Sequence, residues 1–357
     1  MECPAIVFID DEPSVLNALR RLLRISHRDW KMHFFSSPVQ ALEALADIAP
    51  WVVVADKRMA EMDGVVLLQQ VAERMPETIR VLLSGDARLD SAMEGAVAAH
   101  FVLRKPFERE TIDHLLTRSR VLHQLPLSLS RRRQLGQING LPVLPRIYQQ
   151  ITLELDQEEP DVAVVASLIR EDQGLLSRVL QLVNSPFFGF TARTQEVEVA
   201  VMRLGLQTIH NLVLITELYH QGPSRLLKVG ERLMREALLL AEQVGTVCDL
   251  RKVSKQVRNL AVISGLLHNI GELVLALHAV PAEGDASIVE DEMQLVGAYL
   301  LELWGFESGV VEAVQHQRDE VLPEDSEPVA ELLNMALKIK SGSADEAQIL
   351  KMDQDEH

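Results

Sequence analysis

Short apolar runs alternate with amphipathic segments through the first third of the chain. Four runs, at 5–9, 51–55, 79–83 and 101–103, are rich in valine, leucine and isoleucine. Runs of this length indicate strands that are buried on both faces of a parallel sheet. A weaker strand is expected at 30–35. The segments between them predict helices that begin at 13, 38, 65 and near 90 and 108. This alternation predicts a doubly wound α/β domain with a five-stranded parallel sheet.

Beyond residue 135 the strand-like runs disappear and long amphipathic segments follow one another. Helices are predicted at 162–169, 175–183, 197–204, 209–219, 225–247, 257–267, 273–278, 290–304, 309–316 and 328–339. The second part is therefore expected to be an all-α domain. Residues 117–133 predict an extended last helix that runs into a linker. The expected boundaries are 1–122, a helical linker at 123–133, a helical domain at 134–340, and an acidic, disordered tail at 341–357.

Composition narrows the class of protein. The chain has 357 residues, 47% of them hydrophobic, which is enough for two domains with separate cores. No continuous apolar run approaches the ~18 residues of a membrane span, and no signal-peptide pattern opens the chain. Cys3 and Cys248 are too few for a disulfide framework or a thiolate metal site. These observations predict a cytoplasmic protein.

The acidity of the chain belongs to its second part. The formal charge is −17, of which residues 1–122 carry −3 and residues 123–357 carry −14. A DNA-binding domain is expected to present a basic face, so the second part is predicted to meet proteins or small molecules instead. Arg131, Arg132 and Arg133 form a short basic cluster, which we interpret as a solvated face of the linker rather than a nucleic-acid site.

Acidic side chains stand where the predicted strands end. Asp10 and Asp11 follow the first apolar run, and Asp56 ends another. The carboxyl ends of parallel strands meet at one edge of the sheet, where such folds bind ligands. Carboxylate oxygens suit Mg²⁺, and the carbonyl oxygen of Arg58 can add a further ligand. The sequence thus predicts a magnesium site formed by Asp10, Asp11, Asp56 and the Arg58 carbonyl.

The same edge carries groups suited to phosphoryl chemistry. An Asp carboxylate such as that of Asp56 can attack a phosphoryl group and form an aspartyl phosphate. Ser84 and Lys105 follow the next two apolar runs. Their hydroxyl and ammonium groups can contact phosphoryl oxygens. Each residue alone is a weak signal, but their order on consecutive strand ends is specific.

These motifs make residues 4–122 resemble a response-regulator receiver domain, which has a flavodoxin-like fold. The matching segments are Ile9-Asp10-Asp11-Glu12, Ala55-Asp56-Lys57-Arg58-Met59, Met62-Asp63-Gly64, Leu83-Ser84-Gly85 and Leu103-Arg104-Lys105-Pro106-Phe107. The resemblance implies phosphotransfer from a sensor histidine kinase to Asp56, with Mg²⁺ near Asp11. It also implies that Ser84 and Lys105 bind the phosphoryl group. Two residues depart from the family: Ala60 stands where proline is frequent, and Val102 stands where an aromatic residue is common.

The second part contains a histidine motif. Gly265-Leu266-Leu267-His268-Asn269 resembles the His-Asp pair of the HD phosphohydrolases, but Asn269 replaces the aspartate and Glu236 stands where an earlier histidine is usual. An amide is a poor ligand for a hard divalent cation. We therefore interpret His268 as a core histidine rather than a metal ligand.

Residues 134–340 as a whole resemble an HDOD domain, a non-catalytic relative of those enzymes. The matching segments are Leu141-Pro142, 169–186 and 199–205, together with the His268 motif. The resemblance implies a binding platform in signalling, without a metal. Phe187, Phe188 and Phe190 form an aromatic cluster, which we interpret as a plug between helical layers in preference to a contact surface.

The leading hypothesis is a two-component response regulator whose helical domain binds downstream proteins and catalyses no reaction. The alternative is a cyclic-nucleotide phosphodiesterase of the HD superfamily that acts through His268. A DNA-binding regulator is disfavoured by the charge of the second part, and no membrane contact is expected. The sequence leaves the oligomeric state open, a homodimer included.

Overall fold

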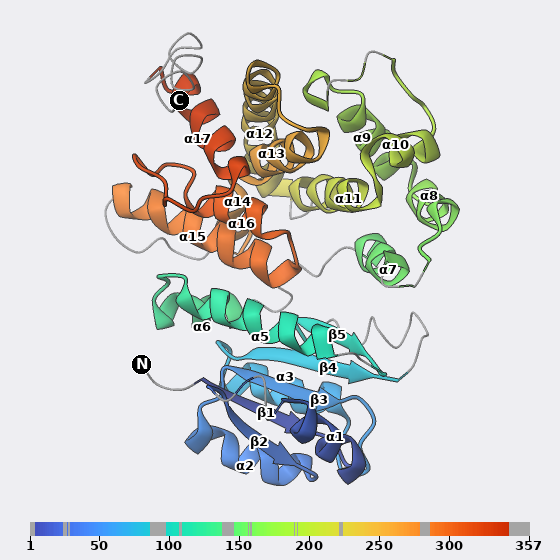
Figure 1. Cartoon of the computed structure of the whole chain (residues 1–357), viewed down its shortest axis with the longest axis vertical. Helices are drawn as coiled ribbons and strands as arrows, with labels where there is room; N and C mark the ends of the chain where they lie inside the picture. Colours follow the sequence, from blue (N-terminus) through green and yellow to red (C-terminus); the bar gives the residue numbers. More distant parts are fainter. Residues whose placement is uncertain are drawn as a thin grey trace. The chain divides into compact units, whose positions relative to one another are not determined.

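The chain divides into two compact units. The computed structural model describes residues 4–342, apart from 24–26, 28, 86–97, 107–108, 138–145, 156, 158, 189, 191, 221–223 and 279–285. The first unit is Met1–Val143 and the second is Leu144–His357 (Figure 1). The described part of the acidic tail ends at Gly342, so the predicted disorder of the tail lies outside the described residues.

A five-stranded parallel sheet forms the centre of the first unit. Its strands are β1 (Ala5–Ile9), β2 (Lys31–Phe35), β3 (Val52–Asp56), β4 (Ile79–Ser84) and β5 (Phe101–Arg104). Their order in the sheet is β2-β1-β3-β4-β5, and all neighbours are parallel. The sheet confirms the predicted α/β architecture.

Helices cover the sheet and explain the continuous apolar strands. They are α1 (Pro13–Leu23), α2 (Pro38–Ile48), α3 (Gly64–Arg74), α5 (Arg109–Gln124) and α6 (Leu129–Gln137). Val7, Val53 and Leu82 pack with α2 and α3 in one core. Their strand neighbours, such as Phe8 and Val54, point to the opposite face because side chains alternate along a strand, and they are buried too. The helix predicted near residue 90 lies outside the described residues.

The stretch 117–133, predicted as an extended last helix that runs into a helical linker, contains the end of one helix and the start of another. Helix α5 ends at Gln124 and α6 begins at Leu129. Pro126 separates them, because proline lacks an amide hydrogen and its ring clashes with the preceding turn of a helix. Ser128 then starts α6, since its Oγ accepts a hydrogen bond from the Arg131 amide at 3.0 Å. The expected boundary at residue 134 falls inside α6.

Arg131 and Arg132 of the cluster in α6 do not lie on a solvated face, which corrects the interpretation from sequence for these two, whereas Arg133 is exposed. Arg131 is fully buried, with no exposed surface. The Arg132 guanidinium donates to three main-chain carbonyls at and beyond the end of α5, those of His123, Leu125 and Leu127. Arginine suits this role because its five N–H donors are arranged in a fixed fork. The cluster therefore fixes the turn between α5 and α6.

Helix α6 also packs on the connection between α3 and β4. Arg133 pairs with Glu77 at 3.1 Å. A Cβ atom on Gly136 would lie 1.9 Å from the carbonyl oxygen of Pro76, so only glycine allows the helix to approach this closely. Helix α6 is thus an integral part of the first unit.

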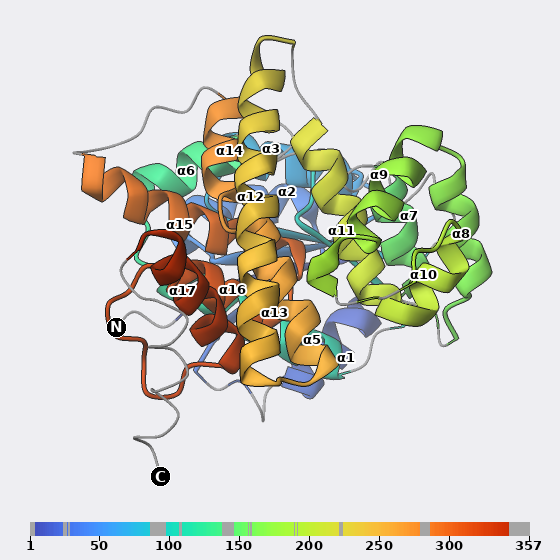
Figure 2. The ribbon, with the colours of Figure 1, turned by 90° about the horizontal axis from the view of Figure 1, so that it is seen from above.

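In the described residues of the second unit, the regular elements are all helices. Its helices are α7 (Arg146–Leu155), α8 (Val162–Arg170), α9 (Gln173–Val183), α10 (Val197–Leu204), α11 (Leu206–His220), α12 (Ser224–Arg251), α13 (Lys255–Leu267), α14 (Ile270–Leu277), α15 (Ala286–Trp304), α16 (Ser308–Gln315) and α17 (Pro328–Lys340). All predicted helices are present, and α7 was not predicted. Helix α11 packs on α7, α9 and α10 and also on α12 and α13, and so joins two groups of helices (Figure 2).

The phenylalanine cluster follows α9 and confirms the interpretation as a plug for two of its members. Phe187 and Phe188 lie in a short 3₁₀ turn (Pro186–Phe188) and are buried. Gly245 of α12 provides the space, since a Cβ there would come within 3.0 Å of the Phe187 Cα. Phe190 is only half-buried.

Helices α13 and α14 together have the length and hydropathy of a membrane span, over Lys255–Leu277. Of the apolar window, 72% is buried inside the second unit. A core helix of a soluble protein has the same properties, so this stretch is weak evidence for a membrane contact.

A buried histidine is expected to make the second unit sensitive to acid. The His210 ring stacks on Tyr148, with ring centroids 3.8 Å apart, and its Nε2 lies 3.2 Å from the Tyr148 carbonyl oxygen. Its Nδ1 has no hydrogen-bond partner in the described part of the chain. Burial lowers the pKa of His210 to about 4, against the effect of the Tyr148 carbonyl.

Between pH 6.5 and 4 the unfolded state therefore binds more protons at His210 than the native state, and stability falls as the pH falls. We expect this residue to lower the free energy of unfolding by about 2 kcal/mol between pH 7 and pH 5. In His210→Phe, which keeps an aromatic ring on Tyr148, that part of the pH dependence should disappear. Urea unfolding followed by circular dichroism at both pH values measures it. An unchanged pH dependence would contradict the assignment.

Candidate functional site

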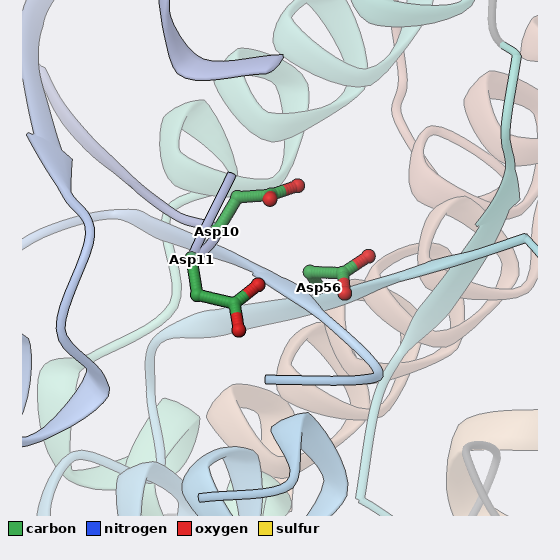
Figure 3. Close-up of side chains that lie close together, drawn as sticks. All are labelled: Asp10, Asp11 and Asp56. Carbon is green, nitrogen blue, oxygen red and sulfur yellow. The ribbon is translucent and has the colours of Figure 1, made fainter. Parts of the chain in front are cut away.

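Three carboxylates meet at the carboxyl end of the sheet. Asp10 and Asp11 follow β1, and Asp56 is the last residue of β3. Strands β1 and β3 pair with Ile9 opposite Ala55, so both strands end at the same level. One side-chain oxygen from each residue lies within 4.8 Å of the other two, as the grouping in Figure 3 shows. The structure thus brings together the residues that the sequence placed at this edge.

Tight turns orient two of these side chains. Asp10 Oδ1 accepts a hydrogen bond from the Glu12 amide at 2.9 Å, and Asp56 Oδ2 accepts one from the Arg58 amide at 3.0 Å. Such bonds from a residue two positions ahead are typical where an Asp ends an element and the chain turns. Each carboxylate is held while its other oxygen faces the site.

Lys105 neutralises part of the charge. Its Nζ lies 2.6 Å from Asp10 Oδ2 and 2.5 Å from Asp56 Oδ1. Burial alone would lower the pKa of Lys105, but the hydrogen bonds and charges of the two carboxylates outweigh it and raise the pKa. The side chain is therefore a fixed ammonium beside Asp56. One cation faces three carboxylates, which leaves an excess of negative charge for a metal ion.

Ser84 and Asp11 complete the site. Ser84 is the last residue of β4, is buried, and follows Leu83, the residue that pairs with Asp56. Asp11 is half-buried, and its Oδ2 accepts a hydrogen bond from the Ala60 amide at 2.8 Å. A role for Ala60 could not be predicted from the sequence, because a main-chain donor leaves no signature in the side chain.

The loop after Asp56 approaches the strand end closely. Gly64 begins α3, and a Cβ at this position would lie 2.1 Å from the carbonyl oxygen of Asp56. The Gly64 amide donates to the Lys57 carbonyl at 2.9 Å. Asp63 caps the helix by accepting from the Val65 amide. Together these contacts fix the position of the loop at residues 57–63.

The donor set fits a hard divalent cation. Asp10, Asp11 and Asp56 offer carboxylate oxygens at a partly buried edge, and Mg²⁺ takes oxygen ligands while it keeps several waters. Among the described residues, no other group of three His, Cys, Asp or Glu side chains is close enough to hold a metal.

The histidine motif of the second unit lies between α13 and α14. Nδ1 of the half-buried His268 is 2.8 Å from the Gly265 carbonyl oxygen. The buried Asn269 accepts a hydrogen bond from the Tyr219 hydroxyl and donates to the Leu233 carbonyl at 2.9 Å. Glu236, in the place expected for a histidine, pairs with Arg232.

Comparison with known proteins agrees with both halves of this description. Residues 6–117 match the response regulator receiver domain. Residues 141–320, half of the chain, match the HDOD domain. The chain belongs to the HDOD family. It is an HDOD protein with an N-terminal receiver domain, as the sequence predicted.

Similar proteins in bacteria include regulators. The chain is 26% identical over 235 residues to an uncharacterized protein of Treponema pallidum, covering 59% of this chain and 45% of that protein. It is 31% identical over 112 residues to the DNA-binding transcriptional regulator NtrC of Escherichia coli, covering 31% of this chain and 24% of that protein. The chain spans less than half the length of either relative. The receiver domain and these relatives support a two-component response regulator.

Two solved structures are similar to this chain. The signal receiver domain of an HD domain-containing protein from Pseudomonas fluorescens is 27% identical and covers 34% of this chain and 98% of that chain, with a TM-score of 0.32. A putative metal-dependent phosphohydrolase from Shewanella amazonensis is 18% identical and covers 68% of this chain and 89% of that chain, with a TM-score of 0.49.

Proposed function

We propose that Asp56 of this HDOD protein accepts a phosphoryl group from a sensor histidine kinase, and that the HDOD domain passes the signal to partner proteins without catalysis of its own. The observation that carries the proposal is the position of the Lys105 ammonium, which contacts both Asp10 and Asp56 at the open end of the sheet. A carboxylate beside a fixed cation and two further acids is the arrangement that phosphotransfer to an aspartate needs.

In this reaction a carboxylate oxygen of Asp56 forms a bond to phosphorus while the bond from phosphorus to the donor breaks. With acetyl phosphate as donor, acetate leaves as an anion and no proton transfer is needed. Lys105 is placed to pair with a phosphoryl oxygen once its contact with Asp56 is exchanged. The buried hydroxyl of Ser84 would donate to another phosphoryl oxygen.

Asp10, Asp11, Asp56 and the carbonyl oxygen of Arg58 would hold Mg²⁺, which when bound offsets the negative charge of the phosphoryl oxygens and the carboxylates. The protein supplies the orientation of these ligands, because the turns after Asp10 and Asp56 hold their carboxylates through main-chain amides. We propose no metal for the HDOD domain.

The hydrogen bonds of the second unit support an output domain without hydrolase activity. Asn269 uses its amide oxygen and nitrogen in bonds to Tyr219 and Leu233 inside the core. Arg232 sits between the carboxylates of Glu236 and Glu272, so these acids already have a cation. We expect no metal-dependent hydrolysis of cyclic nucleotides. Turnover that depends on His268, together with bound metal, would favour the phosphodiesterase alternative.

The proposal places the protein in the cytoplasm, where histidine kinases present their phosphoryl groups. The acidic second part favours proteins over DNA or a membrane as partners. The receiver, expected at 1–122, would extend through α6 to Gln137, and the output domain would follow it. A homodimer is compatible with this arrangement.

Labelling with a small phosphodonor tests the proposal. The full chain is incubated with radiolabelled acetyl phosphate and Mg²⁺, with a parallel sample in EDTA. We expect a label that requires Mg²⁺ and is released by hydroxylamine, as an acyl phosphate is. The proposed function would be overturned if the chain acquired no label with Mg²⁺ present, either from acetyl phosphate or from cell extracts that contain histidine kinases.

Ser84→Ala is expected to leave phosphorylation of Asp56 largely unchanged and to weaken the response of the HDOD domain to it. The variant keeps Asp56 and Lys105, so labelling should stay within a few-fold of wild type. It loses one hydrogen bond to the phosphoryl group, which is worth about 1–2 kcal/mol. This loss should weaken the preference of the phosphorylated receiver for its active state roughly tenfold. Hydrogen exchange of the HDOD helices with and without beryllofluoride measures the response. Ser84→Thr keeps a hydroxyl and is the matched control; equal responses in Ser84→Ala and wild type would exclude this role of Ser84.

A further inference from the structure

The hydrogen bond between Ala60 and Asp11 joins two loops at the site. The Ala60 amide belongs to the loop after β3, and Asp11 to the loop after β1. The donor nitrogen lies 2.8 Å from Asp11 Oδ2. Within the described residues this is the one hydrogen bond to the Asp11 carboxylate, whereas Asp10 and Asp56 each accept from a nearby amide and from Lys105. The orientation of Asp11 thus depends on Ala60.

The loop that carries Ala60 is fixed by contacts that do not involve Asp11. Before Ala60, the Lys57 amide donates to the Leu83 carbonyl at 2.9 Å. After it, the Gly64 amide donates to the Lys57 carbonyl at 2.9 Å. The side chain of the next residue, Glu61, accepts through Oε2 from Ser37 Oγ at 2.6 Å. Met59, the preceding residue, is buried in the core below α2 and α3. The amide is therefore held in place, and the half-exposed Asp11 side chain is the member of the pair that it orients.

A main-chain amide can orient a carboxylate without cancelling its charge. An ionised carboxylate has two oxygens and about four lone-pair positions, so one hydrogen bond leaves room for a metal ion. Lys105, in contrast, brings a positive charge to Asp10 and Asp56 and competes with a cation there. Asp11 is the acid of the three that Lys105 does not contact, and it is still held in position by a hydrogen bond. Groups that orient ligating carboxylates commonly raise metal affinity by about 10- to 100-fold.

We propose that the main-chain N–H of Ala60 is a positioning group that holds the Asp11 carboxylate ready for the divalent cation. This inference rests on the proposed magnesium site and adds a determinant of its affinity. Proline, which is frequent at this place in receivers, has no N–H and cannot make the bond. The residue that departs from the family pattern thus supplies a contact of its own.

Ala60→Pro tests the proposal. Ala60 has a negative φ, which proline requires. We expect the Kd for Mg²⁺, measured by titration calorimetry on the full chain, to rise about tenfold. Ala60→Ser keeps the amide and should stay within twofold of wild type. Thermal unfolding in EDTA shows whether either substitution perturbs the fold.

Two further measurements separate the loss of the N–H from a disturbed loop. Replacement of the Ala60 amide by an ester, introduced by semisynthesis, removes the donor without a proline ring and should raise the Kd to a similar extent. In an Asp11→Ala background, Ala60→Pro should have no additional effect, because alanine has no side-chain oxygen to accept the hydrogen bond from the Ala60 amide.

The results distinguish this inference from the proposed function. If Ala60→Pro and the ester variant both bind Mg²⁺ at least as tightly as wild type, the role of Ala60 is overturned. The magnesium site itself would remain intact. No Mg²⁺ binding by the wild-type chain would overturn the site and this inference together. A weaker affinity in both variants, with Ala60→Ser unchanged, is the result we expect.

Discussion

Asp56→Asn is expected to reduce phosphorylation by acetyl phosphate to background. Asparagine has almost the same shape, and its side-chain oxygen can still accept from the Arg58 amide. It lacks the anionic oxygen that must form the bond to phosphorus, so the reaction loses its nucleophile rather than its geometry. Radiolabel per chain, in the presence of Mg²⁺, is the measurement.

Asp63→Asn is the matched control for this loss. Asp63 is exposed, lies seven residues further on, and caps α3 through the Val65 amide. An asparagine caps a helix nearly as well, so labelling should be unchanged. Label retained by Asp56→Asn, and mapped to Asp10 or Asp11 by mass spectrometry, would show that another acid is the acceptor.

Gly64→Ala is expected to destabilise the first unit by about 1–3 kcal/mol. The added Cβ would lie 2.1 Å from the Asp56 carbonyl oxygen and 3.2 Å from Leu82 Cδ1, and an oxygen atom of the main chain cannot move aside. The gain of up to about 1 kcal/mol from the better helix propensity of alanine is smaller than this clash. The start of α3 must shift, and the loop with Arg58 and Ala60 shifts with it. Chemical denaturation and Mg²⁺-dependent labelling should both show the damage.

Gly85→Ala provides the comparison on the neighbouring strand. A Cβ on Gly85 would meet no atom of the described residues within 4 Å, and its backbone is not in the left-handed region. Its effect on the free energy of unfolding should stay within about 0.5 kcal/mol. If Gly64→Ala and Gly85→Ala have the same free energy of unfolding, the loop after β3 can move to accommodate the added Cβ. That result would contradict the argument that the contact between Gly64 and the Asp56 carbonyl requires glycine.

The strands and the acidic edge could be predicted from the sequence because each depends on local pattern. A run such as Val52–Val53–Val54 has no polar face, so only a strand covered on both sides accommodates it. Once the strands are parallel, the residues that follow them must meet at one edge. This is why Asp10, Asp56 and Lys105 were found together.

Features set by contacts distant in sequence could not be predicted. Nothing in the spacing of Arg131 indicates that it is fully buried, since its surroundings come from the packing of α6 on the first unit. The Ala60 amide matters only because the chain brings it to Asp11. The break at Pro126 was predictable in principle from proline chemistry. Helix α7 carries Ile147, Ile151 and Leu155 at helical spacing, so its sequence does contain the pattern that predicts a helix.

The attachment of α6 to the receiver has a consequence for anyone who recombines this chain with other signalling modules. A fragment cut at residue 122 would lack the end of α5 and all of α6, and with them the Arg132 bonds to the His123 and Leu125 carbonyls and the Gly136 contact with Pro76. A hybrid regulator that retains this receiver should therefore carry the native chain through Gln137 before the foreign sequence begins.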